Sequence, residues 1–301
     1  IMTDQDHDGF HIKGLLLNMF HSMWPSLLDK DFISYMNTPI VKVWLKKDIK
    51  SFYTLTDYNQ WKEKTKNYKK YNIKYYKGLG TSTAKESKEY FKELKLNTYV
   101  SPEKELTDKS INLAFNKKQA DDRKEWLKKY DENEILDYKI PETKIEDFIN
   151  KELIHFSNAD TCRSIGSCMD GLKTSQRKIL YSCFKRKLYS EIRVAQLAGY
   201  VSEHAAYHHG EASLQGAIIN MAQNFVGSNN INVLMPNGQF GTRIMGGSDS
   251  ASPRYIHTEL NPIVDTIYPK DDMPLLKYTD DDGLLVEPEY YVPIIPMVLV
   301  N

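Results

Sequence analysis

The stretch Asp4-Gln5-Asp6-His7-Asp8-Gly9 and the pattern that follows it are the part of the sequence that most restricts the fold. Apolar residues recur at helical spacing from Ile12 to Leu28, and residues 39–45 then alternate like a strand. An acidic segment at a strand end, followed by a glycine, a helix and another strand, is typical of an α/β layer. We therefore predict an α/β arrangement for the first third of the chain.

Three aspartates at every second position form the first candidate site. In an extended chain, residues two apart point to the same face, so Asp4, Asp6 and Asp8 would form one row at the end of a strand. Such a row suits hard divalent cations and, with paired ions, phosphoryl chemistry. A calcium-binding EF-hand loop also begins D-x-D-x-D-G, but it requires Glu at its last position, where this chain has Leu15. A solvated acidic turn is the alternative that stays open.

The charge of the chain is unevenly distributed. Its 301 residues include 40 Lys and Arg against 40 Asp and Glu, so the formal net charge is zero. The length predicts about two domains, and the neutral total argues against a uniformly basic nucleic-acid-binding protein. Residues 51–100 and 163–193, however, each carry +6, and residues 271–289 carry −6. The net charge of zero is therefore the sum of strongly basic and strongly acidic segments.

The cysteines and the apolar runs indicate the compartment. Cys162, Cys168 and Cys183 lack C-x-x-C spacing, so neither a disulfide framework nor a zinc site is predicted, and a reduced intracellular setting fits best. No stretch reaches the roughly 18 to 20 apolar residues of a membrane span, so we expect a soluble protein with no membrane partner. Because neither end reads as a polar tail, we expect part of a longer chain.

A glycine-rich turn is the second candidate site. Residues 71–77 are predicted as a strand that Gly78 and Gly80 interrupt, and Thr83-Ala84-Lys85-Glu86 is a capping-box pattern that opens a helix through residue 94. Glycines after a strand let backbone amides approach a phosphate, with Lys77 adding charge. P-loop spacing is missing, so an ordinary strand-to-helix turn is the alternative.

The rest of the chain is predicted to be rich in helices. Residues 116–130 form a polar helical pattern in which Glu125 precedes Lys129 by four positions, and Pro141 marks a linker. Four short helical patterns follow, at residues 145–154, 174–185, 194–204 and 214–224. Several short helices with a basic one among them suit a helix-turn-helix or winged-helix domain.

Basic side chains near the second of these short helices form the third candidate site. Lys173, Arg177 and Lys178 would contact DNA phosphates, which position a duplex without reading its sequence. A solvated helix face is an equal alternative. The adjacent His208 and His209 would bind phosphate, bind metal or form a turn, and metal is least favoured because adjacent histidines rarely chelate one ion.

The segment from Gly246 to Tyr255 is the fourth candidate site. Its small residues form an exposed loop, and Pro253 holds the backbone extended before Arg254. A tyrosine hydroxyl, with a pKa near 10, needs a base or a cation to act as a nucleophile. Arg254 would lower that cost and neutralise a pentavalent phosphate. Because the chain has 20 tyrosines, composition alone does not single out Tyr255.

Taken together and in this order, these motifs resemble the central part of a eukaryotic-type DNA topoisomerase II, a type IIA enzyme. The resemblance extends over residues 1–301. The segments that carry it are DQDHDG with HIKGLL, YYKGLGTST, FNKKQADDRKEW, FINKELIHFSNAD, DGLKTSQRKIL, VAQLAGYVSEHAAYHHGE, NMAQNFVGSNN, GQFGTR, GGSDSASPRY and EPEYYVPIIP.

The resemblance implies a multidomain fold of α/β and α+β type. Its parts would be an N-terminally truncated, Rossmann-like TOPRIM domain at residues 1–110, a helical linker region at 111–150, a winged-helix DNA-cleavage domain at 151–262, and the start of a tower or shoulder domain at 263–301. The family's E-G-D-S motif, which supplies a further metal-ligand Glu, is missing, as are the ATPase region and the C-terminal gate. Phe10 replaces a usual Ser, and Thr174-Ser175 replaces Pro-Gly.

The resemblance also assigns roles to individual residues. Tyr255 would be the nucleophile that joins a 5′ DNA phosphate, Arg254 would stabilise the transition state, and Arg163 and His209 would surround the scissile phosphate. Asp4, Asp6 and Asp8 would be the TOPRIM carboxylates, the first two as direct ligands of Mg²⁺, with Mn²⁺ or Ca²⁺ as substitutes. The DNA-contacting positions would be Arg123, Lys124, Lys173, Tyr207, Ser213 and Lys77.

The implied function is Mg²⁺-dependent, reversible breakage of double-stranded DNA through a 5′-phosphotyrosyl intermediate. In the full-length homodimer this would support strand passage, driven by ATP bound in a domain outside this chain. The implied location is the nucleus for a cellular protein, and a viral factory or virion for a viral one. Two other functions stay open: a non-catalytic winged-helix DNA-binding module, and a TOPRIM-type nuclease that cleaves with metal-activated water.

Overall fold

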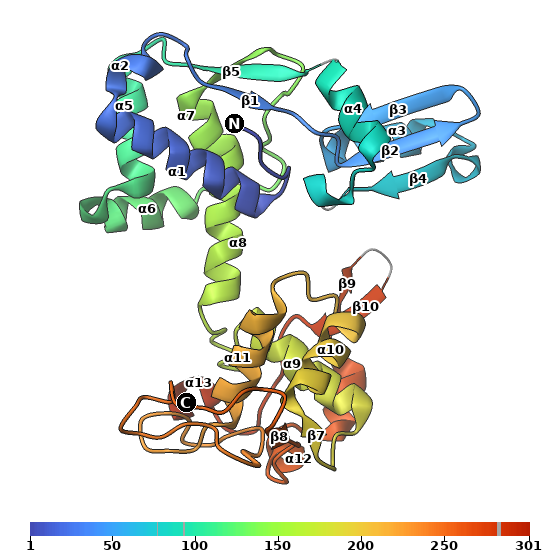
Figure 1. Ribbon diagram of the computed structural model, residues 1–301, viewed down its shortest axis with the longest axis vertical. Coiled ribbons are helices and arrows are strands. Elements are labelled where there is room, and N and C mark those ends of the chain that lie inside the picture. The colour runs from blue at the N-terminus through green and yellow to red at the C-terminus, as the bar shows by residue number, and fades with distance from the viewer. Residues whose placement is uncertain (77, 93, 282–283) are drawn as a thin grey trace. The chain divides into compact units, whose positions relative to one another are not determined.

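The computed structural model describes residues 1–76, 78–92, 94–281 and 284–301, and the chain divides into two compact units, Ile1–Ala159 and Asp160–Asn301. Both units combine helices with small sheets (Figure 1). The predicted mixture of α/β and α+β structure is confirmed at that level. Among the described residues, none of the helices has the length and apolar character that crossing a bilayer requires.

The first unit places helices around two small sheets. Its helices are α1 (His7–Met23), α2 (Pro25–Leu28), α3 (Leu55–Lys64), α4 (Ala84–Lys92), α5 (Lys104–Phe115), α6 (Ala120–Leu127), α7 (Ile145–Phe148) and the start of α8 (Ile154–Ser164), with the short helical segments η1 (Tyr68–Lys70), η2 (Leu79–Thr81), η3 (Lys117–Gln119) and the π-helix η4 (Ile149–Leu153). Its strands are β1 (Ser34–Met36), β2 (Val41–Leu45), β3 (Asp48–Phe52), β4 (Asn72–Tyr75), β5 (Leu96–Val100) and β6 (Glu142–Lys144).

The two sheets of the first unit have the strand orders β1-β5-β6 and β3-β2-β4. Only the β5–β6 pair among them is parallel, within the described residues. The N-terminal residue runs beside β1, since the Ile1 carbonyl accepts a hydrogen bond from the Met36 amide at 2.9 Å. α1 packs against α5 and η4, so its N-terminal end is fixed to the core of the unit.

Local sequence signals explain where the helices of this unit begin. The Asp6 carboxylate accepts the Gly9 amide at 2.7 Å and caps α1. At α4, the Glu86 carboxylate accepts the Thr83 amide at 2.7 Å, while the Thr83 hydroxyl accepts the Glu86 amide at 3.3 Å. These reciprocal bonds form the capping box that the sequence predicts, which is therefore confirmed.

The polar helix predicted in the middle of the chain is confirmed as η3 and α6, which end at Leu127. Two other expectations are wrong. Glu125 pairs with Lys128 at 2.6 Å, not with Lys129. Pro141 opens no linker, because its carbonyl accepts the Thr98 amide at 2.8 Å and β6 follows it directly. Residues 111–150 therefore pack within the first unit. The boundaries of the four predicted domains stay predictions.

The second unit is largely helical. Its helices are α9 (Thr174–Arg186), α10 (Val194–His204), α11 (Glu211–Ala222), α12 (Val264–Ile267) and α13 (Met297–Val300), with η5 (Lys270–Leu275); its strands are β7 (Ile192–Arg193), β8 (His257–Thr258), β9 (Tyr278–Asp281) and β10 (Leu284–Pro288). The predicted helices near 174–185, 194–204 and 214–224 are confirmed as α9, α10 and α11.

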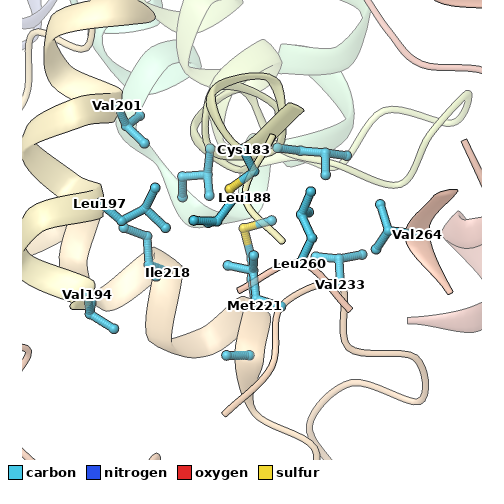
Figure 2. Packing of buried hydrophobic residues seen from close by; sticks show 14 of the residues in the cluster. Cys183, Leu188, Val194, Leu197, Val201, Ile218, Met221, Val233, Leu260 and Val264 are labelled. Carbon is cyan, nitrogen blue, oxygen red and sulfur yellow. The ribbon is translucent and has the colours of Figure 1, made fainter. Parts of the chain in front are cut away.

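The core of the second unit joins these three helices to the long irregular segment that follows them. Cys183, Leu197 and Ile218 meet Leu260 and Val233 in one buried cluster (Figure 2). Burial raises the pKa of the Cys183 thiol to about 12, so this cysteine acts as a packed apolar group. The cluster therefore anchors both sides of the irregular segment that carries Tyr255.

Candidate functional site

The Asp4 carboxylate is held by the glycine-rich turn. Its Oδ1 accepts the backbone amide of Leu79 at 2.6 Å, although the two residues are 75 positions apart. The first and second candidate sites are therefore one structure. The hypothesis that this turn cradles a phosphate does not fit the Leu79 amide, because a protein carboxylate already occupies it.

Two glycines make this arrangement possible. A Cβ on Gly78 would lie 2.5 Å from the Asp4 Cγ, and Gly78 has a φ of +85° and a ψ of 179°. A Cβ on Gly9 would lie 1.9 Å from the Asp4 carbonyl oxygen. Side chains cannot occupy either space, so both glycines are needed for the backbone to close around Asp4.

The predicted row of three carboxylates is not formed as an extended strand. α1 begins at His7, so Asp8 lies in its first turn while Asp4 and Asp6 precede it. The reason is that Asp6 caps the helix, which turns the chain after one extended step. Among the described residues, no three His, Cys, Asp or Glu side chains gather as a metal site. Asp4 and Asp6, which precede the first turn of α1, remain candidate metal ligands.

The far side of the glycine turn is fixed by Glu86. Burial works against the charged form of Glu86, but hydrogen bonds from Lys74, Tyr76 and Thr83 outweigh it and lower its pKa to about 2. Lys74 Nζ lies 2.8 Å from Oε2, and the Tyr76 hydroxyl donates to Oε1 at 2.5 Å. The carboxylate thus connects β4 to α4 across the turn.

We expect Gly78→Ala to destabilise the first unit by about 1–3 kcal/mol, the usual cost of a backbone conformation that only glycine adopts readily. Gly80→Ala is the matched control, because nothing lies within 4 Å of its added Cβ. All four tryptophans, at positions 24, 44, 61 and 126, lie in the first unit, so urea unfolding followed by tryptophan fluorescence measures this unit. Equal stability of the two variants would show that the close approach to Asp4 is unimportant.

Tyr255 lies on an exposed turn with buried neighbours. Its side chain is 68% exposed, whereas Ile256 is 2% exposed and belongs to the core. The amide of Ala195, at the start of α10, donates to the Pro253 carbonyl at 3.1 Å, and the Val194 amide donates to the Ile256 carbonyl at 3.0 Å. The backbone is therefore fixed on both sides of Tyr255 while its ring faces solvent.

Arg254 and the preceding loop complete the surroundings of this tyrosine. The Arg254 guanidinium carbon lies 5.0 Å from the centre of the Tyr255 ring. The loop before them is closed by Asp249, whose carboxylate accepts the Thr242 amide at 2.7 Å and the Thr242 hydroxyl at 2.9 Å. The first of these bonds is the main reason that the pKa of Asp249 is lowered. A cation thus lies near the ring of an exposed tyrosine, on a loop that is closed by hydrogen bonds.

The other predicted phosphate-surrounding residues lie in the second unit. Arg163 is half-buried, and its Nε lies 3.0 Å from the Asp160 carboxylate. His209 is exposed, and its ring meets that of Tyr207 edge-on at 5.5 Å.

The predicted DNA-contacting residues have different surroundings. Lys173 is exposed at the start of α9, and Ser213 is exposed in the first turn of α11. In the first unit, Arg123 donates to the carbonyls of Leu113 and Asn116, while Lys124 is exposed and pairs with Asp121 at 2.7 Å. Lys77 lies outside the described residues.

Arg177 does not lie on a DNA-facing surface, which corrects the prediction for the basic stretch. It is 6% exposed, and its Nε and Nη2 lie 2.7 and 2.9 Å from the Asp170 carboxylate. Asp170 also accepts the amides of Leu172 and Tyr291. Lys178 is engaged as well, since its Nζ lies 2.8 Å from Glu287. Part of the acidic 271–289 segment therefore balances part of the basic stretch.

Some positioning residues were missed by the sequence reasoning. Lys13 is fully buried in α1, and its Nζ lies 3.0 Å from Glu152 in η4. The signal was present, because Lys13 shares a helical stripe with Phe10 and Leu17. Asn237, whose amide pairs with His257 beside the Tyr255 turn, carries no comparable signal, since the contact joins irregular segments.

The chain is similar to known proteins over its whole length. Residues 36–161 match the family described as the C-terminal associated domain of TOPRIM, and residues 163–301 match the family of the DNA gyrase/topoisomerase IV A subunit. The chain is 55% identical to human DNA topoisomerase 2-alpha and 54% identical to DNA topoisomerase 2 of Saccharomyces cerevisiae, with all of the chain aligned in both cases. It spans 20% and 21% of those two proteins, respectively.

A solved structure agrees with these matches. The crystal structure of the Plasmodium falciparum topoisomerase II DNA-binding, cleavage and re-ligation domain superposes with a TM-score of 0.82 and 53% identity, covering 100% of this chain and 41% of that one. Two units that carry TOPRIM-associated and gyrase-A-like segments define a type IIA topoisomerase core. The chain belongs to the eukaryotic DNA topoisomerase II family.

Proposed function

We propose that this chain is the DNA-cleavage core of a type IIA topoisomerase. The observation that carries the proposal is the exposed Tyr255, beside Arg254 on a turn fixed by the core of its unit. Every part of this chain is similar to a segment of the DNA topoisomerase 2 proteins, and this similarity supports the proposal. At the finer level, we propose a Rossmann-like TOPRIM fold for the start of the chain and a winged helix around α9, α10 and α11.

The proposed reaction is a reversible transesterification. The Tyr255 hydroxyl gives up its proton and its oxygen attacks a DNA phosphorus. The bond from phosphorus to the 3′ oxygen breaks, and the tyrosine becomes joined to the 5′ phosphate. The released 3′ oxygen takes up a proton, and its later attack on the phosphotyrosine reverses the step. One phosphoester replaces another, so resealing needs no external energy source.

Arg254 is proposed to stabilise the charge that builds up on the phosphate. Its guanidinium lies 5.0 Å from the centre of the Tyr255 ring and presents a planar fork of N–H donors that matches the oxygens of a phosphate. Arg163 and His209 are proposed to contribute to the same phosphate environment. Lys173, Tyr207, Ser213, Arg123 and Lys124 are proposed to hold the DNA backbone, and Lys77 is proposed from its sequence position alone.

The carboxylates at the start of α1 are of the chemical type that binds a hard divalent cation. Carboxylate oxygens are the ligands that Mg²⁺ prefers, and the Leu79 amide fixes the orientation of Asp4. Asp4 and Asp6, with Asp8 nearby, would hold Mg²⁺, or Mn²⁺ or Ca²⁺ in its place. When bound, the ion supplies positive charge that stabilises the phosphate oxygens.

The protein's partners follow from the same proposal. We propose that it acts on double-stranded DNA as a homodimer in which the carboxylates of one protomer work with the Tyr255 of the other. ATP would act outside this chain, which spans about a fifth of its relatives. The proposed location is the nucleus in a cell.

We expect Asp4→Asn combined with Asp6→Asn to lower DNA cleavage by the full-length protein on the order of 100-fold, as loss of a preorganised charge does in other active sites. Asparagine still caps a helix and still accepts the Leu79 amide, so folding is retained while the charge is lost. Asp29→Asn, which changes an exposed carboxylate at the end of α2, is the control. Cleavage would be measured across a magnesium titration, and unchanged cleavage in the double variant would refute the metal role.

A further inference from the structure

Eight lysines gather at one end of the β3-β2-β4 sheet in the first unit, and the proposed cleavage reaction uses none of them. Three segments carry these lysines: the β2–β3 hairpin, the C-terminal end of α3 with the two residues after it, and η1. The lysine cluster consists of Lys46, Lys47, Lys50, Lys62, Lys64, Lys66, Lys69 and Lys70. Seven of the eight are exposed, and Lys62 is half-buried.

Aromatic contacts bring the three segments together. The β2–β3 turn and the start of β4 lie at the same end of the sheet (Figure 1). Just before β4, the Tyr71 hydroxyl donates to the Asp48 carboxylate of β3 at 2.7 Å. The Tyr71 ring centre lies 5.1 Å from that of Trp61 in α3, and Lys50 Nζ lies 5.9 Å from the centre of a Trp61 ring. The hairpin, the end of α3 and η1, which Tyr71 follows directly, are therefore held next to one another.

The positive charge of this surface is not balanced by nearby acids. Residues 46–71 contain the eight lysines against three acids, a net charge of +5. One of these acids, Asp48, already accepts the Tyr71 hydroxyl. In the part of the chain that the structure describes, none of the eight lysines forms an ion pair with a carboxylate, whereas Lys42 and Lys74 of the same sheet both do. The mutual repulsion of these charges favours a polyanionic partner.

The composition of the cluster favours DNA over an acidic protein. Lysine is depleted at protein–protein interfaces, whereas protein–DNA interfaces are strongly positive. Lysines neutralise phosphates without reading the sequence, and arginine is prominent among the residues that read base edges. The first arginine of the chain is Arg123, so the cluster contains none. Lys62 Nζ lies 5.2 Å from the centre of the Tyr68 ring, a contact that orients the lysine without neutralising its charge.

We propose that the lysine cluster binds double-stranded DNA through its phosphates and without sequence preference. It adds a further DNA-binding surface to the residues proposed to surround the cleaved phosphate. Five of its lysines lie in the basic segment 51–100, so the proposal gives much of that charge a role. The proposal does not rest on the cleavage reaction, since it involves neither Tyr255 nor a metal.

The test replaces one lysine of each segment in the full-length protein, all three together: Lys47→Gln, Lys64→Gln and Lys69→Gln. The matched control changes three exposed lysines of the first unit outside the cluster and removes the same charge: Lys30→Gln, Lys104→Gln and Lys109→Gln. Binding of a short duplex would be measured by fluorescence anisotropy across a salt titration without magnesium. Each phosphate contact contributes about 0.9 to the slope of log K against log salt, so the slope should become less steep by about 2–3 in the cluster variant and stay unchanged in the control. A duplex of scrambled sequence should give the same values.

A second measurement locates the contact. Lysines of the parent protein would be acetylated with an N-hydroxysuccinimide ester, with and without duplex, and quantified by peptide mass spectrometry. Acetylation should fall at the three cluster positions when duplex is bound and should not change at the three control positions. Adduct formation at Tyr255 is measured separately, so a failure of the cleavage proposal would leave this result untouched.

Three results would overturn the proposal. An unchanged salt slope in the cluster variant, with no protection from acetylation, would mean that the cluster does not contact DNA. An equal change in both variants would assign the effect to net charge alone. Tighter binding of polyglutamate than of duplex at equal concentration of negative charge, lost in the cluster variant, would assign the surface to an acidic protein.

Discussion

Replacing Tyr255 with phenylalanine in the full-length protein will abolish the denaturant-resistant protein–DNA adduct while leaving DNA binding intact. The substitution removes only the hydroxyl oxygen that would form the bond to phosphorus. The ring is 68% exposed and makes no packing contribution that the phenyl group cannot keep. Adduct formation should fall below detection, because a phenyl ring offers no nucleophile at all.

The control for this experiment is another exposed tyrosine of the same unit. Tyr290 is 40% exposed and lies between β10 and α13, so Tyr290→Phe removes a hydroxyl from a different segment of the unit. Binding to a short duplex would be measured by fluorescence anisotropy for both variants, and the adduct would be measured on denaturing gels. An adduct that persists in the Tyr255 variant would exclude this residue as the nucleophile. A loss of binding would instead assign it to DNA recognition.

The second large effect concerns the buried Lys13–Glu152 pair. We expect Lys13→Met to destabilise the first unit by about 3–5 kcal/mol, because the substitution leaves a buried carboxylate without its partner. Both side chains are 1% exposed, and Lys13 also lies 4.4 Å from the centre of the Tyr35 ring. Urea unfolding followed by tryptophan fluorescence measures the change, because every tryptophan lies in this unit.

Two further variants separate the charge from the packing. Adding Glu152→Gln to Lys13→Met removes the orphaned charge and keeps the acceptor for the Tyr138 hydroxyl, so most of the lost stability should return. Lys128→Met breaks an exposed pair with Glu125 and should cost at most about 1 kcal/mol. If the double variant is as unstable as Lys13→Met alone, loss of packing around the lysine stem explains the effect, and the charge argument is wrong.

Much of the fold could be predicted because local signals determine it. The Thr83–Glu86 capping box and the helical spacing of α9, α10 and α11 are short-range patterns, and all of them are confirmed. The errors arose where a local pattern competes with tertiary contacts. Pro141 resembles a linker residue in sequence, but pairing of β6 with β5 places it at the edge of a sheet.

The sequence indicated which residues belong to the candidate site, but it did not indicate how they are arranged in space. An aspartate row suggests a strand, but helix capping by Asp6 turns the chain before Asp8. The connection of Asp4 to Leu79 spans 75 positions, and no periodic pattern reports so distant a contact. Burial of Arg177 was equally hidden, because its partner Asp170 is one of only two acids in the basic stretch 163–193. The resemblance to topoisomerase II supplied the residue roles that local patterns left open.

Covalent attachment of Tyr255 to DNA can be located by mapping the adduct. The full-length protein would be trapped on duplex DNA, digested with nuclease and trypsin, and analysed by tandem mass spectrometry. Cleavage after Arg254 and Lys270 yields a peptide with two tyrosines, Tyr255 and the buried Tyr268, which is 1% exposed. We expect a nucleotide joined through its 5′ phosphate to Tyr255. Attachment to Tyr268 or to any other residue, or cleaved DNA with free 5′ ends and no modified peptide, would contradict it.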